Sequence, residues 1–256
     1  VVIVTSLGRD EALARKTLEA AGRRGVRLLG PNCLGLLVPG AGLDASFAQV
    51  AARPGGLALL SQSGGVCTAA LDWAHERGIG FSCVVSFGDS LDVDAGDLMD
   101  HLGADPATHA ILLYIESVRH ARKFLSAARA AARNKPVLVI KSGRRSEGAR
   151  AAASHSGALA GSDDVYDAAI RRAGMLRVER IDELFAAAET IARAPRIEGD
   201  RLAILTNGGG PAVLATDMLV ARGGQIADIS ESTLARLDEV LPATWSRANP
   251  VDIIGD

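Results

Sequence analysis

This sequence of 256 residues has few aromatic side chains, few cysteines and a net charge close to zero. Phe, Trp and Tyr together make up only 4% of it, so Ala, Val, Leu and Ile must fill the core, which suits layered α/β packing. The three cysteines include no Cys-x-x-Cys pair, which argues against a disulfide framework or a zinc site and fits a reducing cytosol. A net charge of -2 gives no sign of a surface for nucleic acid or for a membrane.

Long apolar runs are also missing, because the longest extend over only several residues and are too short to span a bilayer. We find no signal peptide, and we therefore expect a cytoplasmic protein. The sequence opens on the apolar run Val1–Val4 and stops at Asp256, just after another apolar run. Because a natural protein rarely begins inside a strand, we expect this chain to be a piece of a longer polypeptide.

The sequence does contain a repeated order of a short apolar run, a turn and a segment of helical period. This order predicts a mostly parallel sheet with helices on both faces. Residues 1–40 read as the end of one α/β unit, and the Pro- and Gly-rich residues 38–55 read as a linker. Residues 41–197 predict an α/β domain with a flavodoxin-like, doubly wound parallel sheet, and residues 198–256 predict the truncated start of a further α/β unit.

A Ser- and Gly-rich turn follows the first apolar run of the central segment and consists of Ser61, Gln62, Ser63, Gly64 and Gly65. The helix predicted to begin there leaves several backbone N–H groups without intrahelical partners and adds the positive potential of its dipole. Because glycine lets an anion approach the backbone, this turn is a candidate phosphate site at the carboxyl edge of the sheet. The alternative is a capped helix after a tight turn.

A second glycine-rich turn comes late in the chain and offers the same physical features. It includes Asn207, Gly208, Gly209 and Gly210, between an apolar run and a segment of helical period. Three consecutive glycines cost considerable chain entropy. A close approach of the backbone to a ligand would justify that cost, and so would a strained turn.

Two residues are candidates for catalysis. His155 lies among small residues in the long segment 141–161, where an open imidazole is a competent nucleophile near pH 7. Glu116 ends the apolar run 111–115, at the edge of the sheet where sites assemble, and a carboxylate there can hold the second imidazole nitrogen. The alternatives are a surface histidine in a flexible loop and a helix-capping or surface glutamate.

Four carboxylates follow another predicted strand, namely Asp89, Asp92, Asp94 and Asp97. They are candidate ligands for a cation. Acidic residues are also typical of the first turn of a helix, and we favour that interpretation. We therefore expect no metal site in this chain.

Four motifs occur in the order seen in one family: GPNCLG at 30–35, SQSGG at 61–65, SHSGALAG at 154–161 and TNGGG at 206–210. The sequence thus resembles the nucleoside-diphosphate-forming acyl-CoA synthetases, which are relatives of succinyl-CoA synthetase. The resemblance covers essentially the whole chain. The ordered set of motifs is more specific than any one of them, and the histidine motif is the most specific part.

The resemblance implies an acid–CoA ligase that works through an acyl phosphate. His155 would carry the phosphoryl group between the acyl site and a distant ATP-grasp site, and Glu116 would steady the histidine. The turn at Ser61–Gly65 would hold phosphate at the acyl site, and Asn207–Gly210 would be its counterpart at the other end of the relay. Positioning and charge stabilisation are what phosphoryl transfer mainly requires.

The resemblance also implies coenzyme A and ATP or ADP with Mg as cofactors, and a carboxylic acid or acyl-CoA and phosphate as ligands. Thr5, Ser6, Asn32 and Cys33 match the region that touches coenzyme A. Residues 1–40 would be the remnant of a Rossmann-like CoA-binding domain. We expect the rest of that domain, and the ATP-grasp domain, elsewhere in the same chain or in a partner chain, and we expect a homo-oligomer.

Two other functions stay open at this point. Residues 165–193 and 241–256 look like bacterial proteins that join this synthetase region to a GNAT acetyltransferase, where it serves as an acyl-CoA sensor. A weaker alternative is a plain phosphate- or nucleotide-binding flavodoxin-like module. The acid that is activated, and the choice between ADP and GDP, cannot be inferred from these residues.

Overall fold

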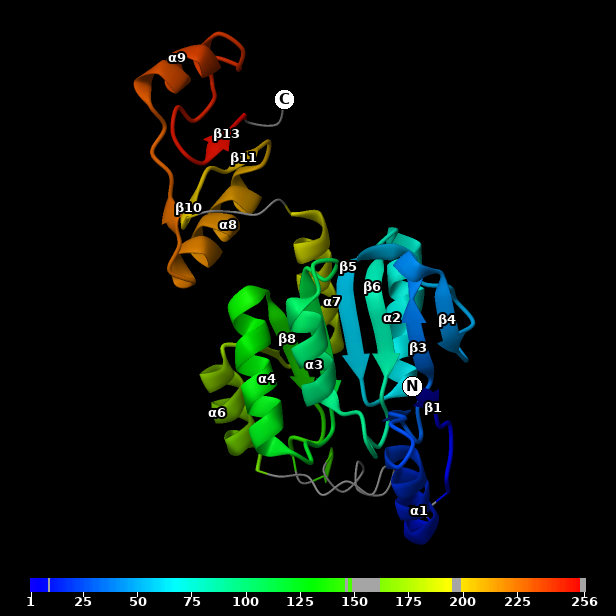
Figure 1. Ribbon diagram of the computed structural model, residues 1–256. Helices are drawn as coiled ribbons and strands as arrows, with labels where there is room; N and C mark the ends of the chain where they lie inside the picture. The colour runs from blue at the N-terminus through cyan, green and yellow to red at the C-terminus, as the bar shows by residue number, and fades with distance from the viewer. Residues whose placement is uncertain (9, 146, 149–161, 195–198, 254–256) are drawn as a thin grey trace. The chain divides into compact units, whose positions relative to one another are not determined.

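The computed structural model describes residues 1–8, 10–145, 147–148, 162–194 and 199–253 (Figure 1). The chain divides into two compact units, Val1–Ala194 and Pro195–Asp256. No helix among the described residues is both long and apolar enough to cross a membrane.

A seven-stranded sheet forms the centre of the first unit, with the strand order β4-β3-β6-β5-β7-β8-β9. The strands are β3 (Gly35–Val38), β4 (Leu43–Ser46), β5 (Pro54–Ser61), β6 (Phe81–Ser86), β7 (Ala110–Ile115), β8 (Val137–Lys141) and β9 (Leu176–Val178). Strands β5 to β9 pair in parallel, whereas β3 pairs antiparallel with both β4 and β6. The predicted α/β class with a mostly parallel, flavodoxin-like sheet is confirmed.

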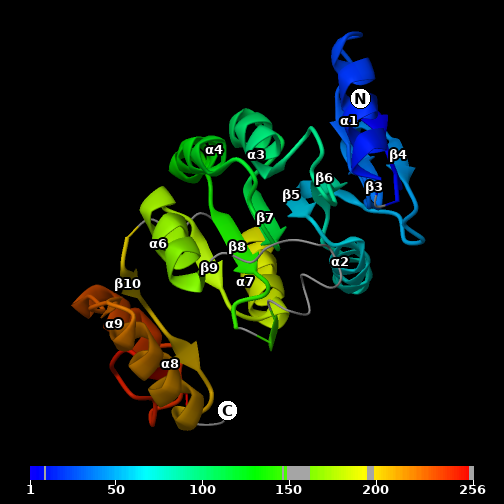
Figure 2. The same ribbon diagram turned by 90° about the horizontal axis from the view of Figure 1, so that it is seen from below.

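Helices cover both faces of this sheet (Figure 2). They are α2 (Gly64–Arg77), α3 (Ala95–Ala104), α4 (Ala121–Asn134), α6 (Asp163–Ala173) and α7 (Ile181–Arg193). One core cluster joins the sheet to α3, α4 and α6 through residues such as Met99 and Ile170, and the other joins it to α2 and α7 through Leu71 and Leu184. Because both faces are covered, β5, β7 and β8 are continuous apolar runs.

The segment 38–55 is not only the linker that its Pro and Gly content predicted. It holds the 3-10 turn η1 (Pro39–Ala41), the strand β4 and the first residues of β5. Pro39 begins the turn, and Gly42 ends it in the left-handed conformation with φ 65°. These residues therefore form a hairpin connection, which adds two antiparallel strands to one side of the sheet.

A short parallel pair precedes the sheet. It consists of β1 (Val2–Ile3) and β2 (Leu28–Leu29), connected by α1 (Glu11–Gly22). The pair contacts the loop after β6, where Arg27 Nε lies 3.0 Å from Asp92 Oδ1 and Asp92 Oδ2 accepts the Leu28 N–H at 2.8 Å. Backbone hydrogen bonds from Leu91 N–H to Gly30 O and from Val93 N–H to Leu28 O join the same segments. The carboxyl ends of β1 and β2 are thereby brought to the carboxyl edge of the large sheet.

The second unit has its own small α/β arrangement. Its elements are β10 (Arg201–Leu202), β11 (Leu205–Thr206), α8 (Gly209–Ala221), β12 (Gln225–Ile226), α9 (Glu231–Asp238) and β13 (Val251–Asp252). Strand β10 pairs in parallel with β12, and β11 pairs in parallel with β13. Ala212, Trp245 and Val251 are buried in it.

Candidate functional site

The Gln62 side chain connects three loops at the carboxyl edge of the sheet. Its Oε1 accepts the N–H groups of Glu116 at 2.6 Å and Ser117 at 3.0 Å, in the loop after β7. Its Nε2 donates to Gly88 O at 3.5 Å, in the loop after β6. Gln62 thus holds the segment that begins with Glu116 against the turn after β5, which brings two of the predicted site segments together.

The two serines beside Gln62 shape the turn and cap α2. Ser61 is fully buried, and its hydroxyl accepts the Ser63 N–H at 3.0 Å and donates to Ser63 O at 2.8 Å. The Ser63 hydroxyl accepts the Val66 N–H at 3.4 Å as the N-cap of the helix. These hydroxyls therefore serve the local fold, in agreement with the capped-helix alternative, and they hold the helix start in place.

Gly64 and Gly65 are the first two residues of α2, where backbone N–H groups have no intrahelical acceptor. A Cβ built at Gly64 would lie 3.5 Å from Leu34 Cβ, and one at Gly65 would lie 3.8 Å from Ser63 Oγ. Among the described residues, none crowds the space beside these two glycines. The helix start thus offers backbone donors and dipole potential to a small anion.

The loop after β2 packs directly on the loop after β6. A Cβ at Gly88, whose φ is +52°, would come within 2.1 Å of Pro31 O, so only glycine allows this approach. Asn32 Nδ2 donates to Asp89 Oδ1 at 3.2 Å, and the Asn32 N–H donates to Thr5 O at 2.9 Å. Asn32 and Thr5 therefore reach the same edge of the sheet as Gln62, because Gln62 bonds to Gly88.

The other residues predicted to touch coenzyme A lie beside Asn32 and Thr5. Thr5 and Ser6 are exposed at the end of β1, and Cys33 is half-buried. The Cys33 Sγ lies 3.5 Å from Val4 O, and burial raises the pKa of its thiol. Cys33 therefore lies at the rim of the site, beside Asn32.

Three of the four acidic residues after β6 form ion pairs, namely Asp92, Asp94 and Asp97. Asp94 caps α3 by accepting the N–H groups of Gly96 and Asp97, which confirms the predicted helix start. Asp94 Oδ1 also lies 3.0 Å from Lys123 Nζ. Despite the cost of burial, the bonds from Lys123, the Asp97 N–H and His120 hold the pKa of Asp94 below its ordinary value.

Lys141 is a residue of this region that the sequence interpretation missed. It ends β8 and is only 2% exposed, and burial lowers the pKa of its ammonium, against the nearby charges of Asp163 and Glu116. The sequence did contain a signal for this residue, because a lysine at the end of an apolar strand lies at the carboxyl edge of a parallel sheet.

His155 lies outside the described residues, in the segment between β8 and α6.

The second glycine-rich turn repeats the first in its local design. The Thr206 hydroxyl accepts the Gly208 N–H at 3.0 Å and donates to Gly208 O at 3.1 Å, much as Ser61 does with Ser63. Gly208 is the N-cap of α8, and Gly209 and Gly210 begin the helix. Asn207 and these glycines belong to the second unit, so each unit carries one such helix start.

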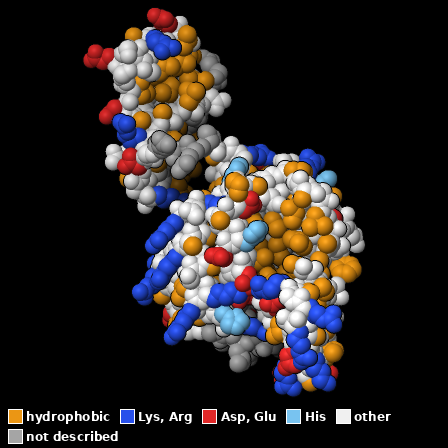
Figure 3. Space-filling model, in the orientation of Figure 1, with side chains coloured by type: hydrophobic (Ala, Val, Ile, Leu, Met, Phe, Trp, Pro, Cys, Tyr) orange, Lys and Arg blue, Asp and Glu red, His pale blue; other side chains and the backbone are white. Residues whose placement is uncertain are grey.

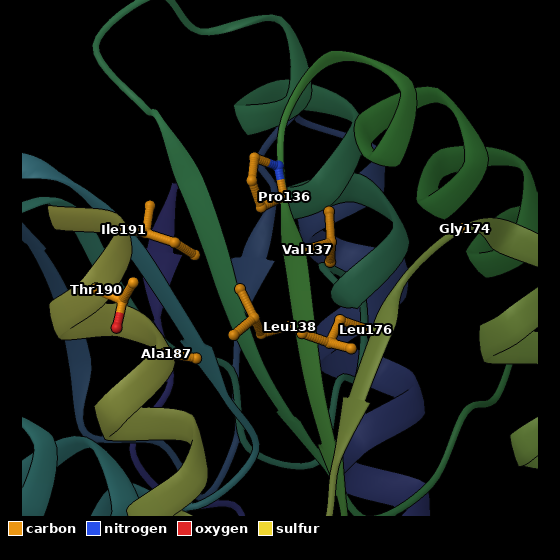
Figure 4. Close-up of a pocket in the computed structure, with 8 residues that line it drawn as sticks. All are labelled: Pro136, Val137, Leu138, Gly174, Leu176, Ala187, Thr190 and Ile191. Carbon is orange, nitrogen blue, oxygen red and sulfur yellow. The ribbon is translucent and has the colours of Figure 1, made fainter. Parts of the chain in front are cut away.

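Two hollows of the first unit lie away from these loops. A groove of about 500 Å³ at the start of β8 is lined mainly by apolar residues, among them Pro136, Leu176 and Ile191 (Figure 4). Another hollow lies between the ends of α4 and α6, on a side where Lys and Arg side chains gather (Figure 3); it is lined by Arg129, Arg133, Arg171 and Arg172 among others. Neither contains a predicted site residue.

The sheet is doubly wound, and its carboxyl edge carries the start of α2, the carboxylate of Glu116 and the buried ammonium of Lys141. These features define the class of protein as an α/β domain suited to binding small anions. Residues 54–191 match the family described as "Succinyl-CoA ligase like flavodoxin domain", and the chain belongs to this family.

Relatives and solved structures agree with this assignment. The chain is 42% identical to acetate–CoA ligase [ADP-forming] I of Archaeoglobus fulgidus, over 99% of the chain and 38% of that protein. It is 42% identical to the alpha subunit of acetate–CoA ligase [ADP-forming] I of Pyrococcus furiosus, over 97% of the chain and 54% of the subunit. The dinucleotide-forming acetyl-coenzyme A synthetase 1 of Ca. Korarchaeum cryptofilum, in complex with phosphate and ADP, matches with a TM-score of 0.91 and 36% identity, over 99% of the chain and 56% of that chain.

The expected resemblance to acyl-CoA synthetases that form a nucleoside diphosphate is confirmed, and these relatives form ADP. The chain corresponds to the alpha-subunit-like part of such ligases and spans 38% to 54% of the two relatives above. The suggested fusion to a GNAT acetyltransferase is not supported, because these relatives are CoA ligases.

Proposed function

We propose that this chain is the acyl-transfer part of an ADP-forming acid–CoA ligase. The observation that supports this most is the meeting of Glu116, Gln62 and the open start of α2 at one edge of the sheet. The chain has this edge together with 42% identity to an ADP-forming ligase alpha subunit along almost its whole length.

The reaction that we propose proceeds through two covalent intermediates. A phosphoryl group on His155 is attacked by the carboxylate oxygen of the acid, so that the P–N bond breaks and an acyl phosphate forms. The thiolate of coenzyme A then attacks the acyl carbon, the C–O bond breaks, and phosphate leaves. The proton of the thiol is lost to solvent or to a base before the attack.

Groups at the carboxyl edge of the sheet stabilise the charges that form during this reaction. Glu116 accepts an N–H from the His155 imidazole and so stabilises the cation that forms when the histidine is phosphorylated. The backbone N–H groups of Gly64 and Gly65 bind the phosphate that leaves the acyl phosphate. Ser61 and Ser63 hold that helix start rigid, and Gln62 sets the distance between it and Glu116.

Coenzyme A fits the rim formed by the ends of β1 and β2. Thr5 and Ser6 expose hydroxyls there, and the Asn32 amide is exposed beside them. When bound, coenzyme A supplies the attacking thiol, and these polar groups orient it toward the start of α2. Cys33 packs beneath this rim through its hydrogen bond to Val4 O.

The nucleotide is used at a second site. Asn207, Gly208, Gly209 and Gly210 form the start of α8 and would receive the phosphorylated histidine at the other end of its path. ADP rather than GDP is supported by the names of the relatives, and the Korarchaeum synthetase was solved as a complex with phosphate and ADP. We further propose Mg with the nucleotide, a nucleotide-binding domain in the same or a partner chain, a homo-oligomeric assembly and a cytoplasmic location.

The test is a ligase assay on the full-length protein that contains this chain. Acetate, coenzyme A and Mg-ATP are supplied, and acetyl-CoA, ADP and phosphate are measured. We expect equal amounts of the three products from the wild type and none from His155→Ala. Release of AMP in place of ADP, or full activity of His155→Ala, would contradict the proposal.

A further inference from the structure

Lys141 is a buried cation to which the proposed reaction assigns no role. Its side chain is 2% exposed at the end of β8. The ammonium donates to Ser142 O and lies 4.6 Å from the centroid of the Tyr166 ring. It forms no ion pair with a carboxylate in the described part of the chain. Burying an ammonium without a paired carboxylate costs free energy, so a role in folding alone does not account for this lysine.

Tyr166 extends this contact to the loop that carries Glu116. Its ring comes from the first turns of α6, and its hydroxyl accepts the Val118 N–H at 3.1 Å. Val118 is two residues beyond Glu116, whose own N–H is held by Gln62 at 2.6 Å. One ring therefore joins the end of β8, the start of α6 and the Glu116 loop.

The start of α6 is fixed from β9 as well. Arg177 has a side chain only 10% exposed, and its Nη2 lies 2.5 Å from Asp163 Oδ1. Its Nη1 lies 3.2 Å from Asp167 Oδ1 in the next turn of the helix. Asp163 is the first residue of α6, so the start of this helix is held to β9 by a charged pair.

We infer that Lys141 and Tyr166 are positioning residues that hold the end of β8 and the start of α6 beside the loop of Glu116. This inference rests on the proposed function, because His155 lies between these two elements in the sequence. The ammonium of Lys141 holds Ser142 after β8, and its contact with the Tyr166 ring holds the start of α6. Both elements are thereby set relative to the carboxylate that is proposed to bind the phosphorylated imidazole.

The charge of Lys141 can be tested separately from the space that its side chain fills. Burial is the largest influence and lowers the pKa of the Lys141 ammonium, while the charges of Asp163 and Glu116 raise it and that of Arg177 lowers it. Replacing Lys141 by Met keeps the length of the side chain but removes the charge. Because the loss of a buried charge is often neutral or stabilising, Lys141→Met is expected to keep or raise the unfolding temperature.

Lys135, at the other end of β8, provides a matched control. Its Nζ donates to three carbonyls, those of Leu102 at 2.9 Å, Asp105 at 2.7 Å and Thr108 at 2.7 Å. Lys135→Met removes all three of these bonds, so it should lower the unfolding temperature. It lies far along the strand from Glu116 and should leave phosphoryl transfer unchanged.

The experiment measures the rate at which full-length protein acquires an acid-labile phosphoryl group from Mg-ATP, together with the unfolding temperature. We expect Lys141→Met to be slower by roughly tenfold to a hundredfold, because small misplacements of reacting groups have effects of this size. Lys141→Arg, which restores the cation, should recover part of the rate. Lys135→Met should react at the wild-type rate.

The outcomes separate the two proposals. A wild-type protein that forms no phosphohistidine refutes the proposed function and this inference with it. A wild-type protein that is phosphorylated, with Lys141→Met equally fast, overturns the inference alone. A slow Lys141→Met whose unfolding temperature also falls, and which Lys141→Arg does not rescue, shows a merely structural lysine and overturns it as well.

Discussion

Removal of the Gln62 side chain should loosen the Glu116 loop. Gln62→Ala deletes the acceptor of two N–H groups, at 2.6 Å and 3.0 Å, and a weaker bond of 3.5 Å to Gly88 O. Each of the two shorter bonds contributes about 0.5–1.5 kcal/mol net, so the free energy of unfolding should fall by about 1–3 kcal/mol. At roughly 2–4 °C per kcal/mol for a unit of this size, the unfolding temperature should fall by roughly 2–12 °C.

Amide hydrogen exchange of Glu116 and Ser117 is the direct assay, because both N–H groups lose their acceptor in Gln62→Ala. We expect faster exchange at these two amides and a slower phosphorylation of His155. Gln225→Ala is the control, since that exposed side chain makes a single bond of 3.4 Å to Asp200 Oδ2 and should change stability by less than about 0.5 kcal/mol. Unchanged exchange at Glu116 and Ser117 in Gln62→Ala would refute the role of Gln62.

Three further predictions concern the same unit. Gly65→Ala places a Cβ in the space proposed for phosphate and should slow the formation of acetyl-CoA. Because alanine favours the helix over glycine, the free energy of unfolding should stay the same or rise by up to about 1 kcal/mol. The control is Gly22→Ala in α1, which should leave the rate unchanged. Despite the cost of burial, the bonds from Arg27 and the Leu28 N–H lower the pKa of Asp92. Arg27→Met should therefore destabilise the fold fully above about pH 4 and progressively less as pH falls through that lowered pKa; an equal deficit at pH 2 would contradict this. Cys67, fully buried with a pKa raised to about 12, should resist alkylation at pH 8 in native protein and react after unfolding.

Much of the fold follows from the order of apolar runs. The strands β5, β7 and β8 and the helices after them were predicted because their residues are buried on both faces of the sheet and leave a continuous apolar signal. The hairpin of β3 and β4 was missed, because Pro39, Gly40 and Gly42 in its turn give the signal of a linker. Short edge strands carry little periodicity of their own.

The site was predictable as a set of segments, but its internal connections were not. The turn at Ser61–Gly65 and the residue Glu116 stand at strand ends in the sequence, so their meeting at one edge was foreseeable. The pairing of Gln62 with the backbone of Glu116 depends on side-chain direction, which spacing does not encode. The importance of Lys141 likewise depends on its burial against Tyr166, which belongs to α6.

His155 is proposed to carry the phosphoryl group between the two sites. The most direct measurement is the intact mass of full-length protein after incubation with Mg-ATP, before and after acid treatment, followed by mapping of the modified peptide. We predict one phosphoryl group that is lost in acid, maps to His155 and transfers to ADP or to acetate. Absence of this group in active protein, or an equal group in His155→Ala, would contradict the account.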